Sequence, residues 1–234
     1  MSNSKAAFLN CCSRFARACL PAHCVLCGTR ACSDALCESC VSSLPRLQSL
    51  RCSICALPLT SGTVCGSCLE CAPAYDSVSA TYAYAFPIDA LIQAYKYGRD
   101  LSLAPLLSAH LARHLRADVD AIIPMPLAAA RLRERGFNQA HELARRSGHA
   151  LALPVMTNAC RKVTDTPPQA ALRWTERARN VRGAFVCDAD LSGKRVAIVD
   201  DVLTTGATLN ELAKNIKRAG AAQVHGWVVA RTLR

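Results

Sequence analysis

Hydrophobic positions beyond residue 73 follow two periods, one typical of helices and one typical of strands. Residues 101–116 repeat apolar side chains every three or four positions, which is the spacing of an amphipathic helix. Further helices are expected at residues 88–97, 137–151 and 208–219. Short apolar runs predict strands at residues 75–86 (a strand or a hairpin), 120–125, 195–199 and 223–230. The alternation predicts an α/β fold, in which helices cover both faces of a mostly parallel sheet.

Composition divides the chain into three expected parts. Residues 1–21 predict a short amphipathic helix, residues 22–72 are rich in cysteines and turns, and residues 73–234 carry the α/β pattern. Within the last part, residues 161–182 are polar, contain prolines and lack a clear period. We expect a long mobile loop there.

Cysteines are concentrated in the first third of the chain. Only Cys160 and Cys187 of the fifteen lie beyond residue 72. Eight of the others form C-x-x-C pairs, which are Cys24 and Cys27, Cys37 and Cys40, Cys52 and Cys55, and Cys65 and Cys68. Each pair supplies two thiolates from one tight turn, and two pairs complete a tetrahedral zinc site. The length of the chain argues against a small secreted disulfide scaffold.

The spacing of these pairs favours sequential pairing, the first with the second and the third with the fourth. The joining segments, residues 28–36 and 56–64, have equal length. Interleaved pairing stays open, and Cys71 competes as a ligand because it follows Cys68 at the same spacing. Four thiolates fill the coordination sphere of zinc, so we expect structural sites, with two zinc ions in all.

The motif with the clearest chemistry lies at residues 196–208. Four apolar residues precede two acids and a hydroxyl-rich turn, which are Asp200, Asp201, Thr204, Thr205, Gly206, Ala207 and Thr208. Backbone N–H groups of such a turn, with the positive end of a helix behind them, suit a phosphate, and adjacent carboxylates suit the two hydroxyls of a ribose. A ligand-free alternative uses the same residues only as helix caps. The two acids directly before the turn favour the ligand site.

This motif resembles the signature of type I phosphoribosyltransferases. Residues 124–139, which contain P-M-P-L and R-G-F-N-Q, and residues 161–169 and 179–185 are similar to motifs of the ComF family. The resemblance implies a type I phosphoribosyltransferase fold preceded by a double zinc ribbon, with phosphoribosyl pyrophosphate and Mg²⁺ as ligands. It also implies that Asp200 and Asp201 hold the ribose hydroxyls at the catalytic centre, while residues 204–208 wrap the 5′-phosphate.

The pyrophosphate of such a ligand needs positive charge around it. Pro126 opens a loop expected to face it, and Arg131, Arg135 and Arg161 supply basic side chains. Residues 161–182 would close over the site and exclude water. The formal net charge of +11 favours polyanionic partners in general, nucleic acid among them.

Two functions follow from the resemblance. The first is transfer of ribose 5-phosphate from phosphoribosyl pyrophosphate to an unknown acceptor, linked to natural competence and DNA uptake. The alternative is a non-catalytic protein of transformation that handles single-stranded DNA and keeps the phosphate cradle. Single-stranded DNA and a DNA-uptake helicase or other competence protein are then expected partners. No apolar run reaches the roughly 18 residues of a membrane-spanning helix, so we expect a cytoplasmic protein.

Overall fold

The computed structural model describes residues 22–31, 35–98, 100–113, 115, 118–164 and 181–233. The helix predicted at residues 1–21 and most of the loop predicted at residues 161–182 lie outside the described residues. Contacts divide the chain into two compact units, Met1–Leu44 and Pro45–Arg234. The division falls inside the predicted cysteine-rich part, so the last two C-x-x-C pairs belong to the same unit as the sheet.

The first unit is built around two tight turns that carry cysteines. Its elements are β1 (Ala22–His23), the antiparallel β2 (Arg30–Ala31) and α2 (Glu38–Ser42). Between the strands, the Gly28 N–H donates to the carbonyl of Cys24 over 2.8 Å and brings Cys27 back beside it. Gly28 adopts the left-handed conformation that this turn requires, with φ 72°. Cys37 precedes α2 and Cys40 lies within it, so both pairs sit on short rigid turns.

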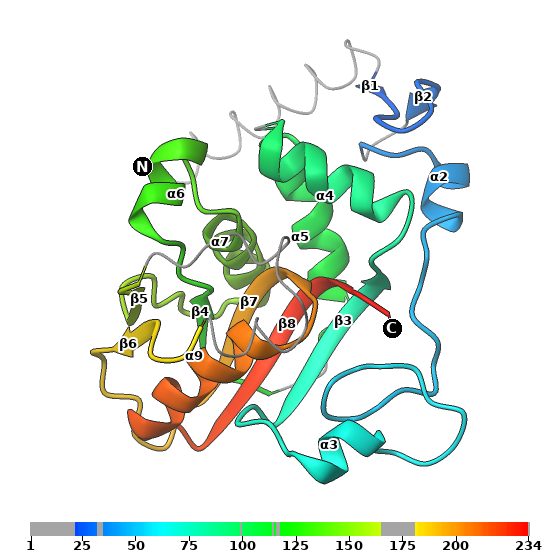
Figure 1. Cartoon of the computed structure of the whole chain (residues 1–234). Coiled ribbons are helices and arrows are strands. Elements are labelled where there is room, and N and C mark those ends of the chain that lie inside the picture. Colours follow the sequence, from blue (N-terminus) through cyan, green and yellow to red (C-terminus); the bar gives the residue numbers. More distant parts are fainter. Residues whose placement is uncertain are drawn as a thin grey trace. The chain divides into compact units, whose positions relative to one another are not determined.

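A parallel sheet forms the centre of the second unit (Figure 1). Its strands in spatial order are β3 (Ser77–Ala83), β8 (Gln223–Arg231), β7 (Arg195–Leu203) and β4 (Ala121–Pro124). All neighbours are parallel, which confirms the predicted sheet. Residues 75–86 hold one strand rather than a hairpin. Strand β7 continues beyond its predicted end to Leu203, because its last residues still pair with β8.

Helices cover both faces of this sheet, as the pattern predicted (Figure 1). One face carries α4 (Ile88–Tyr97), α5 (Leu103–Arg113) and α7 (Gln139–Leu151), and the other carries α9 (Ala207–Arg218). Helix α7 begins later than predicted because Asn138 caps it, accepting a hydrogen bond from the Ala140 N–H over 3.0 Å. The Asn138 amide also donates to the carbonyl of Met125 over 3.1 Å, which fixes the start of α7 to the end of β4. Among the described residues, no helix has both the length and the apolar character to cross a membrane.

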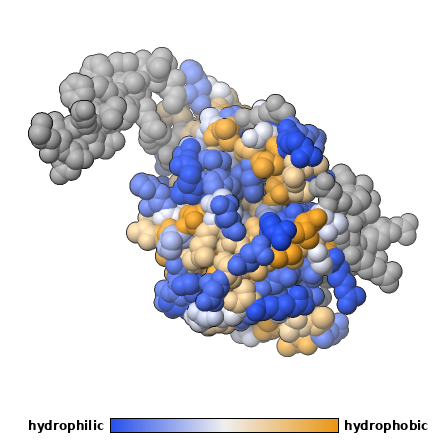
Figure 2. All heavy atoms as spheres, turned by 90° about the vertical axis from the view of Figure 1, so that its left-hand side faces the viewer, coloured by the Kyte–Doolittle hydropathy of each residue, from blue (hydrophilic) through white to orange (hydrophobic). Residues whose placement is uncertain are grey.

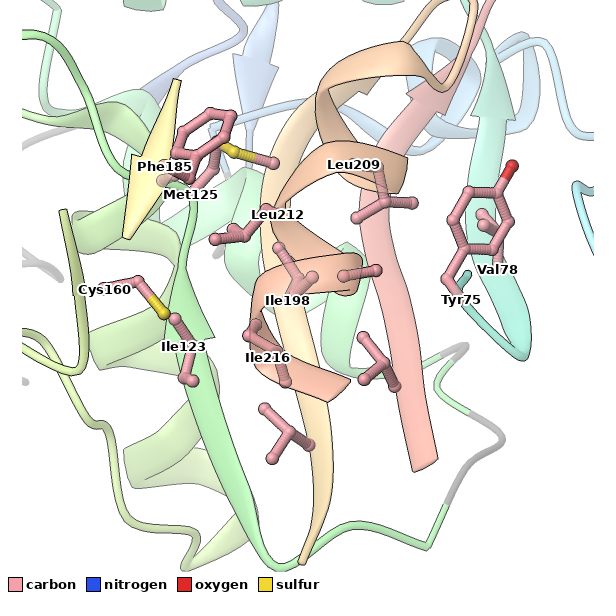
Figure 3. Close-up of a cluster of buried hydrophobic side chains, with 14 of the residues drawn as sticks. Tyr75, Val78, Ile123, Met125, Cys160, Phe185, Ile198, Leu209, Leu212 and Ile216 are labelled. Atoms are coloured by element: carbon pink, nitrogen blue, oxygen red, sulfur yellow. The ribbon is translucent and has the colours of Figure 1, made fainter. Parts of the chain in front are cut away.

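The core under α9 follows from the alternation of side chains along the strands. Leu209, Leu212 and Ile216 of α9 lie over Ile123 of β4 and Ile198 of β7 (Figure 3). All five are buried. Each such side chain contributes about 1.5–3 kcal/mol when it leaves water. This packing holds the first turn of α9 at the carboxyl end of β7.

Three short pieces complete the described part of the second unit. They are α3 (Gly66–Glu70), α6 (Ala129–Arg135) and the antiparallel pair of β5 (Cys160–Lys162) and β6 (Phe185–Cys187). Figure 2 views the side on which α6, β5 and β6 lie and shows a largely hydrophilic surface with small hydrophobic patches. Helix α6 has no buried residue, so its arginines are available to solvent or to a ligand.

Candidate functional site

The carboxyl end of β7 places two adjacent carboxylates on opposite faces of the sheet. Successive side chains of a strand alternate, so Asp200 follows Ile198 on the α9 face and Asp201 follows Val199 on the other. Asp201 is buried and forms an ion pair with Lys96 of α4, with 2.8 Å between Nζ and Oδ1. The Asp201 N–H donates to Oδ1 of Asp200 over 2.9 Å. The structure thereby adds a lysine to the acidic pair that the sequence predicted.

These charges are not balanced. Burial and then the negative charge of Asp201 raise the pKa of Asp200 to about 7, although Lys96 opposes the change. Burial also disfavours the charge on Lys96, but the two carboxylates outweigh it and raise the pKa of that lysine. Within the described part of the chain, the two carboxylates thus share the ammonium group of Lys96. A ligand that offers hydroxyl donors to them would relieve the excess negative charge.

The turn after β7 leads into α9 through a left-handed glycine. Gly206 has φ 84°, and a Cβ at this position would lie 3.1 Å from the hydroxyl oxygen of Tyr75. Gly206 is the N-cap residue of α9 and has no side chain to cap it. The hydroxyl oxygen of Thr205 accepts a hydrogen bond from the Ala207 N–H over 3.1 Å. The positive end of the dipole of α9 therefore lies at this turn, where it favours an anion.

The acidic pair and the turn line one cavity of about 220 Å³. Most of the predicted ligand-binding residues line it, namely Asp200, Asp201, Thr204, Gly206, Ala207, Thr208, Pro126, Arg131 and Arg135. Thr205 instead lines a second cavity behind the turn. The cavity is also lined by Lys96, Asn138, Gln139 and Lys162.

Arg161 was predicted beside the pyrophosphate, but the structure does not bring it to this cavity. It lies on β5 with an exposed side chain, and its Nε is 2.9 Å from Oδ2 of Asp188. The next residue, Lys162, lines the cavity instead. Because neighbouring side chains of a strand face opposite ways, a difference of one position decides which basic residue reaches the site.

Basic side chains form the wall of the cavity that α6 contributes. Arg131 and Arg135 are four residues apart on α6, so they lie on one side of that helix. The guanidinium carbon of Arg135 lies 5.0 Å from the centre of the Tyr97 ring, a cation–π contact that orients it. Together with Lys96 and Lys162, these arginines give the cavity positive charge suited to a polyanion.

Gln139 lines the cavity and carries a buried amide donor. Its side chain is buried, and its Nε2 has no hydrogen-bond partner among the described residues. The Tyr95 hydroxyl donates to the Gln139 carbonyl over 3.0 Å and holds the residue in place. A buried donor without a partner costs about 1–3 kcal/mol, so an acceptor atom of a ligand would offset a real cost. The sequence signal for Gln139 was its place in R-G-F-N-Q.

The eight predicted cysteine ligands gather in two groups of four. The first group is Cys24, Cys27, Cys37 and Cys40, and the second is Cys52, Cys55, Cys65 and Cys68. Within each group the sulfur atoms all lie within 4.8 Å of one another. Tetrahedral zinc with ordinary Zn–S bonds needs sulfur atoms roughly 3.8 Å apart. The groups therefore fit zinc and agree with sequential pairing, and the exposed Cys71 belongs to neither.

The chemistry of the thiols supports cation binding by both groups. Burial opposes ionisation of Cys24 and Cys52, but backbone N–H donors outweigh it and lower their pKa values to about 6 and about 7. The hydrogen bond with Cys27, followed by burial, raises the pKa of Cys40 to about 12. Without a cation, such a cluster keeps protons on some of its thiols. Zinc displaces these protons when it binds.

Comparison with known proteins agrees with both parts of the chain. A double zinc ribbon domain model matches residues 15–69, and a phosphoribosyl transferase domain model matches residues 108–233. Competence protein F of Haemophilus influenzae is 34% identical over 171 residues, which cover 68% of this chain and 74% of that protein. The chain belongs to the ComF family.

Other relatives of this ComF chain carry related names. DNA utilization protein YhgH of Escherichia coli K12 is 33% identical over 169 residues, covering 69% of this chain and 74% of the relative. Competence protein ComFC of Streptococcus pneumoniae is 24% identical over 153 residues, covering 65% and 67%. The predicted fold class, a phosphoribosyltransferase domain with an N-terminal double zinc ribbon, is confirmed by the domain matches, the parallel sheet and the two cysteine groups.

Proposed function

We propose that this ComF protein binds phosphoribosyl pyrophosphate with Mg²⁺ and transfers ribose 5-phosphate to an acceptor, as a cytoplasmic step in handling incoming DNA. One observation carries the proposal. A single cavity combines the carboxylate pair of Asp200 and Asp201, the start of α9 and a basic wall. The relatives named competence protein F and DNA utilization protein support the link to DNA uptake.

The order of these groups along the chain matches the order of groups on the ligand. Asp200 and Asp201 accept hydrogen bonds from the two ribose hydroxyls, and residues 204–208 receive the 5′-phosphate. The turn directly follows the acids, so it is suited to a phosphate and a diol carried by one sugar. Lys96, Arg131 and Arg135 then face the pyrophosphate on C1.

The reaction exchanges one bond at C1 of the ribose. The C1–O bond to pyrophosphate breaks, and the electron pair leaves with the pyrophosphate. A nucleophilic atom of the acceptor forms the new bond to C1 and releases its proton. Positive charge develops on the sugar during this step, and the fixed carboxylates of Asp200 and Asp201 stabilise it.

The donor set at this end of the sheet also fits Mg²⁺. This ion prefers oxygen ligands, and carboxylates together with pyrophosphate oxygens provide them. Asp200 and Asp201 are the residues of the cavity that would hold the ion with the substrate. When bound, Mg²⁺ neutralises part of the charge of the leaving pyrophosphate.

The transfer is tested by pyrophosphate release from the full-length protein. Phosphoribosyl pyrophosphate and Mg²⁺ are supplied with free nucleobases, nucleosides or a single-stranded oligonucleotide in turn. We expect release that depends on one class of acceptor and falls about a hundredfold or more when Asp200 and Asp201 are both changed to Asn. Saturable binding without release from any acceptor would contradict transfer.

That contradictory result would favour the second candidate, a non-catalytic protein that handles single-stranded DNA with a DNA-uptake helicase or other competence protein. The net charge of +11 and the names of the relatives support this alternative. Its test is fluorescence anisotropy with a labelled oligonucleotide over a range of salt concentrations. Affinity that falls steeply with salt would support it, because phosphate contacts release counterions. Affinity that ignores salt would count against it.

A further inference from the structure

The second cysteine group lies directly behind the phosphate turn. A second cavity of about 400 Å³ separates the two, and Cys55, Cys68, Thr205 and Arg231 are among the residues that line it. Gly206 and Ala207 line this cavity and also the candidate substrate cavity. The phosphate turn therefore separates the two cavities. With a cavity on each side, its conformation depends on a small number of contacts.

Arg231 supplies the best-connected of these contacts. It lies near the end of β8 and is only 2% exposed. Its Nε donates to the carbonyl of Cys55 over 3.0 Å. Its Nη1 donates to the carbonyls of Leu203, over 3.0 Å, and of Thr204 and Thr232. One guanidinium thus joins a zinc-binding turn to the first residues of the phosphate turn.

Two further contacts tie the same regions together. The N–H of Ala74, just after the second cysteine group, donates to Oδ1 of Asn210 in the first turn of α9 over 2.6 Å. Ala56, next to Cys55, is fully buried in the hydrophobic cluster that includes Tyr75, the residue under Gly206. All of these contacts lie within the second unit.

We propose that Arg231 is a positioning residue through which the metal-loaded second cysteine group holds the Thr204–Thr208 turn ready to bind the 5′-phosphate. The inference rests on the proposed binding of phosphoribosyl pyrophosphate. It assigns to the second zinc ribbon a part in ligand binding that the first ribbon does not share.

The carbonyl of Cys55 links the second cysteine group to Arg231. The thiolate of that residue is a predicted metal ligand, and the turn that carries it closes through the Ala56 N–H, which donates to the Cys52 carbonyl over 2.9 Å. Loss of the metal releases the turn and displaces the acceptor of Arg231. A buried guanidinium without its partners is costly, so it then shifts towards other acceptors. Its bonds to Leu203 and Thr204 change with it.

The test separates the two ends of the ligand. The phosphate turn should bind ribose 5-phosphate, whereas the basic wall at Arg131 and Arg135 should bind Mg²⁺–pyrophosphate. Dissociation constants for both are measured calorimetrically on the full-length protein, together with zinc content and thermal unfolding. For Arg231→Met we expect about tenfold weaker binding of ribose 5-phosphate, with pyrophosphate binding within about twofold and about two zinc ions retained.

Matched variants complete the experiment. Cys68→Ser removes metal from the second group and should reproduce the selective loss, whereas Cys40→Ser removes it from the first group and should leave both affinities unchanged. Arg195→Met makes the same side-chain change at the amino end of β7 and should also leave both unchanged. If Arg231→Met does not fold, Arg231→Lys keeps the charge with fewer directed hydrogen bonds and should show a smaller loss of the same kind.

The outcomes distinguish this inference from the function on which it rests. Equal loss of both ligands, or no loss of ribose 5-phosphate binding, in Arg231→Met and Cys68→Ser overturns the role of Arg231. Equal effects of Cys40→Ser and Cys68→Ser overturn it as well. A folded, zinc-loaded wild-type protein that binds neither ligand overturns the proposed function, and the inference falls with it.

Discussion

The two ends of strand β7 arrange their charges in opposite ways. At the amino end, Nη2 of Arg195 lies 2.8 Å from Oδ1 of Asp120, and the hydrogen bond from this arginine lowers the pKa of the carboxyl group to about 2. At the carboxyl end, Asp200 and Asp201 share Lys96, and burial raises the pKa of Asp200 to about 7. The same strand therefore favours the charge on one aspartate and disfavours it on another.

We infer that this difference separates charges that stabilise the fold from charges arranged for the proposed ligand. At the amino end, Arg195 forms ion pairs with both Asp118 and Asp120. The carboxyl end retains an acid whose ionisation the free protein resists, beside a cavity lined by Lys96, Arg131 and Arg135. Perturbed acids in a cleft are typical of functional sites, because the ligand supplies what the protein lacks.

The largest effect is expected when both acids at the carboxyl end are neutralised. Changing Asp200 and Asp201 together to Asn should weaken phosphoribosyl pyrophosphate binding about a hundredfold or more, since each charged acceptor contributes about 1.5–3 kcal/mol. Calorimetric titration measures the change. The matched control is Asp118→Asn with Asp120→Asn at the other end of the sheet, which should leave the affinity within about twofold. Equal losses in the two double variants would remove the distinction between the ends.

The next largest effect is expected for the pH dependence of binding, with a change in affinity about a tenth as large. Because the pKa of Asp200 is about 7, its carboxylate becomes fully available to the ribose hydroxyls only above neutral pH. Affinity should rise about tenfold between pH 6 and pH 8. The ligand phosphates also change protonation in this range. The pH dependence of binding to Asp200→Asn shows how much of the effect comes from them. A wild-type profile identical to that of the variant would show that Asp200 does not titrate in the site.

Gln139 provides a finer test of the carboxyl end. Gln139→Met keeps the size of the side chain and removes the unpaired Nε2 donor. Binding of phosphoribosyl pyrophosphate should weaken about fivefold, and the free protein should become slightly more stable because a buried unsatisfied group is lost. Calorimetric titration measures the loss of affinity, and thermal unfolding measures the gain in stability. Unchanged affinity would mean that this donor faces no ligand atom.

The smallest expected effect is on thermal stability, which substitutions at the two ends of β7 should change in opposite directions. Asp200 has a raised pKa, so its contribution is present at low pH and is lost as pH rises from about 4 to about 7. Asp200→Asn should therefore raise the melting temperature at pH 8 by roughly 2–6 °C, and by less at pH 5. Asp120 has a lowered pKa, so its contribution is present above about pH 4 and is lost as pH falls towards 2.

Asp120→Asn should accordingly lower the melting temperature at neutral pH, by a small amount because the pair is solvent-exposed. Differential scanning calorimetry of both variants at pH 5 and pH 8 measures the contrast. If the two substitutions shift the melting temperature in the same direction, the charges at the two ends do not differ in the way described.

Sequence predicted the residues of the candidate site that are contiguous in the chain. Asp200 to Thr208 form one strand, turn and helix, so local pattern was enough to find them. Lys96 comes from α4, which lies on the face of the sheet opposite α9. Only the tertiary fold brings it to Asp201. Between Arg161 and Lys162, the choice depended on strand register, which basic composition does not reveal.

Arg231, whose role is a proposal, was still harder to find from the sequence. In the sequence it is one arginine at the end of the last strand, with no motif around it. Its partners at Cys55 and Leu203 come from distant segments of the second unit, and it is buried between them. Such a residue is visible only when the tertiary contacts are known.

We propose above that phosphoribosyl pyrophosphate binds at the carboxyl end of β7. Calorimetric titration of the full-length, zinc-loaded protein with this ligand and saturating Mg²⁺ tests it most directly. We expect one saturable site per chain, which ribose 5-phosphate competes for and which the Asp200→Asn, Asp201→Asn variant lacks. A folded wild-type protein that gives no saturable binding, or a double variant that binds as tightly as the wild type, would contradict it.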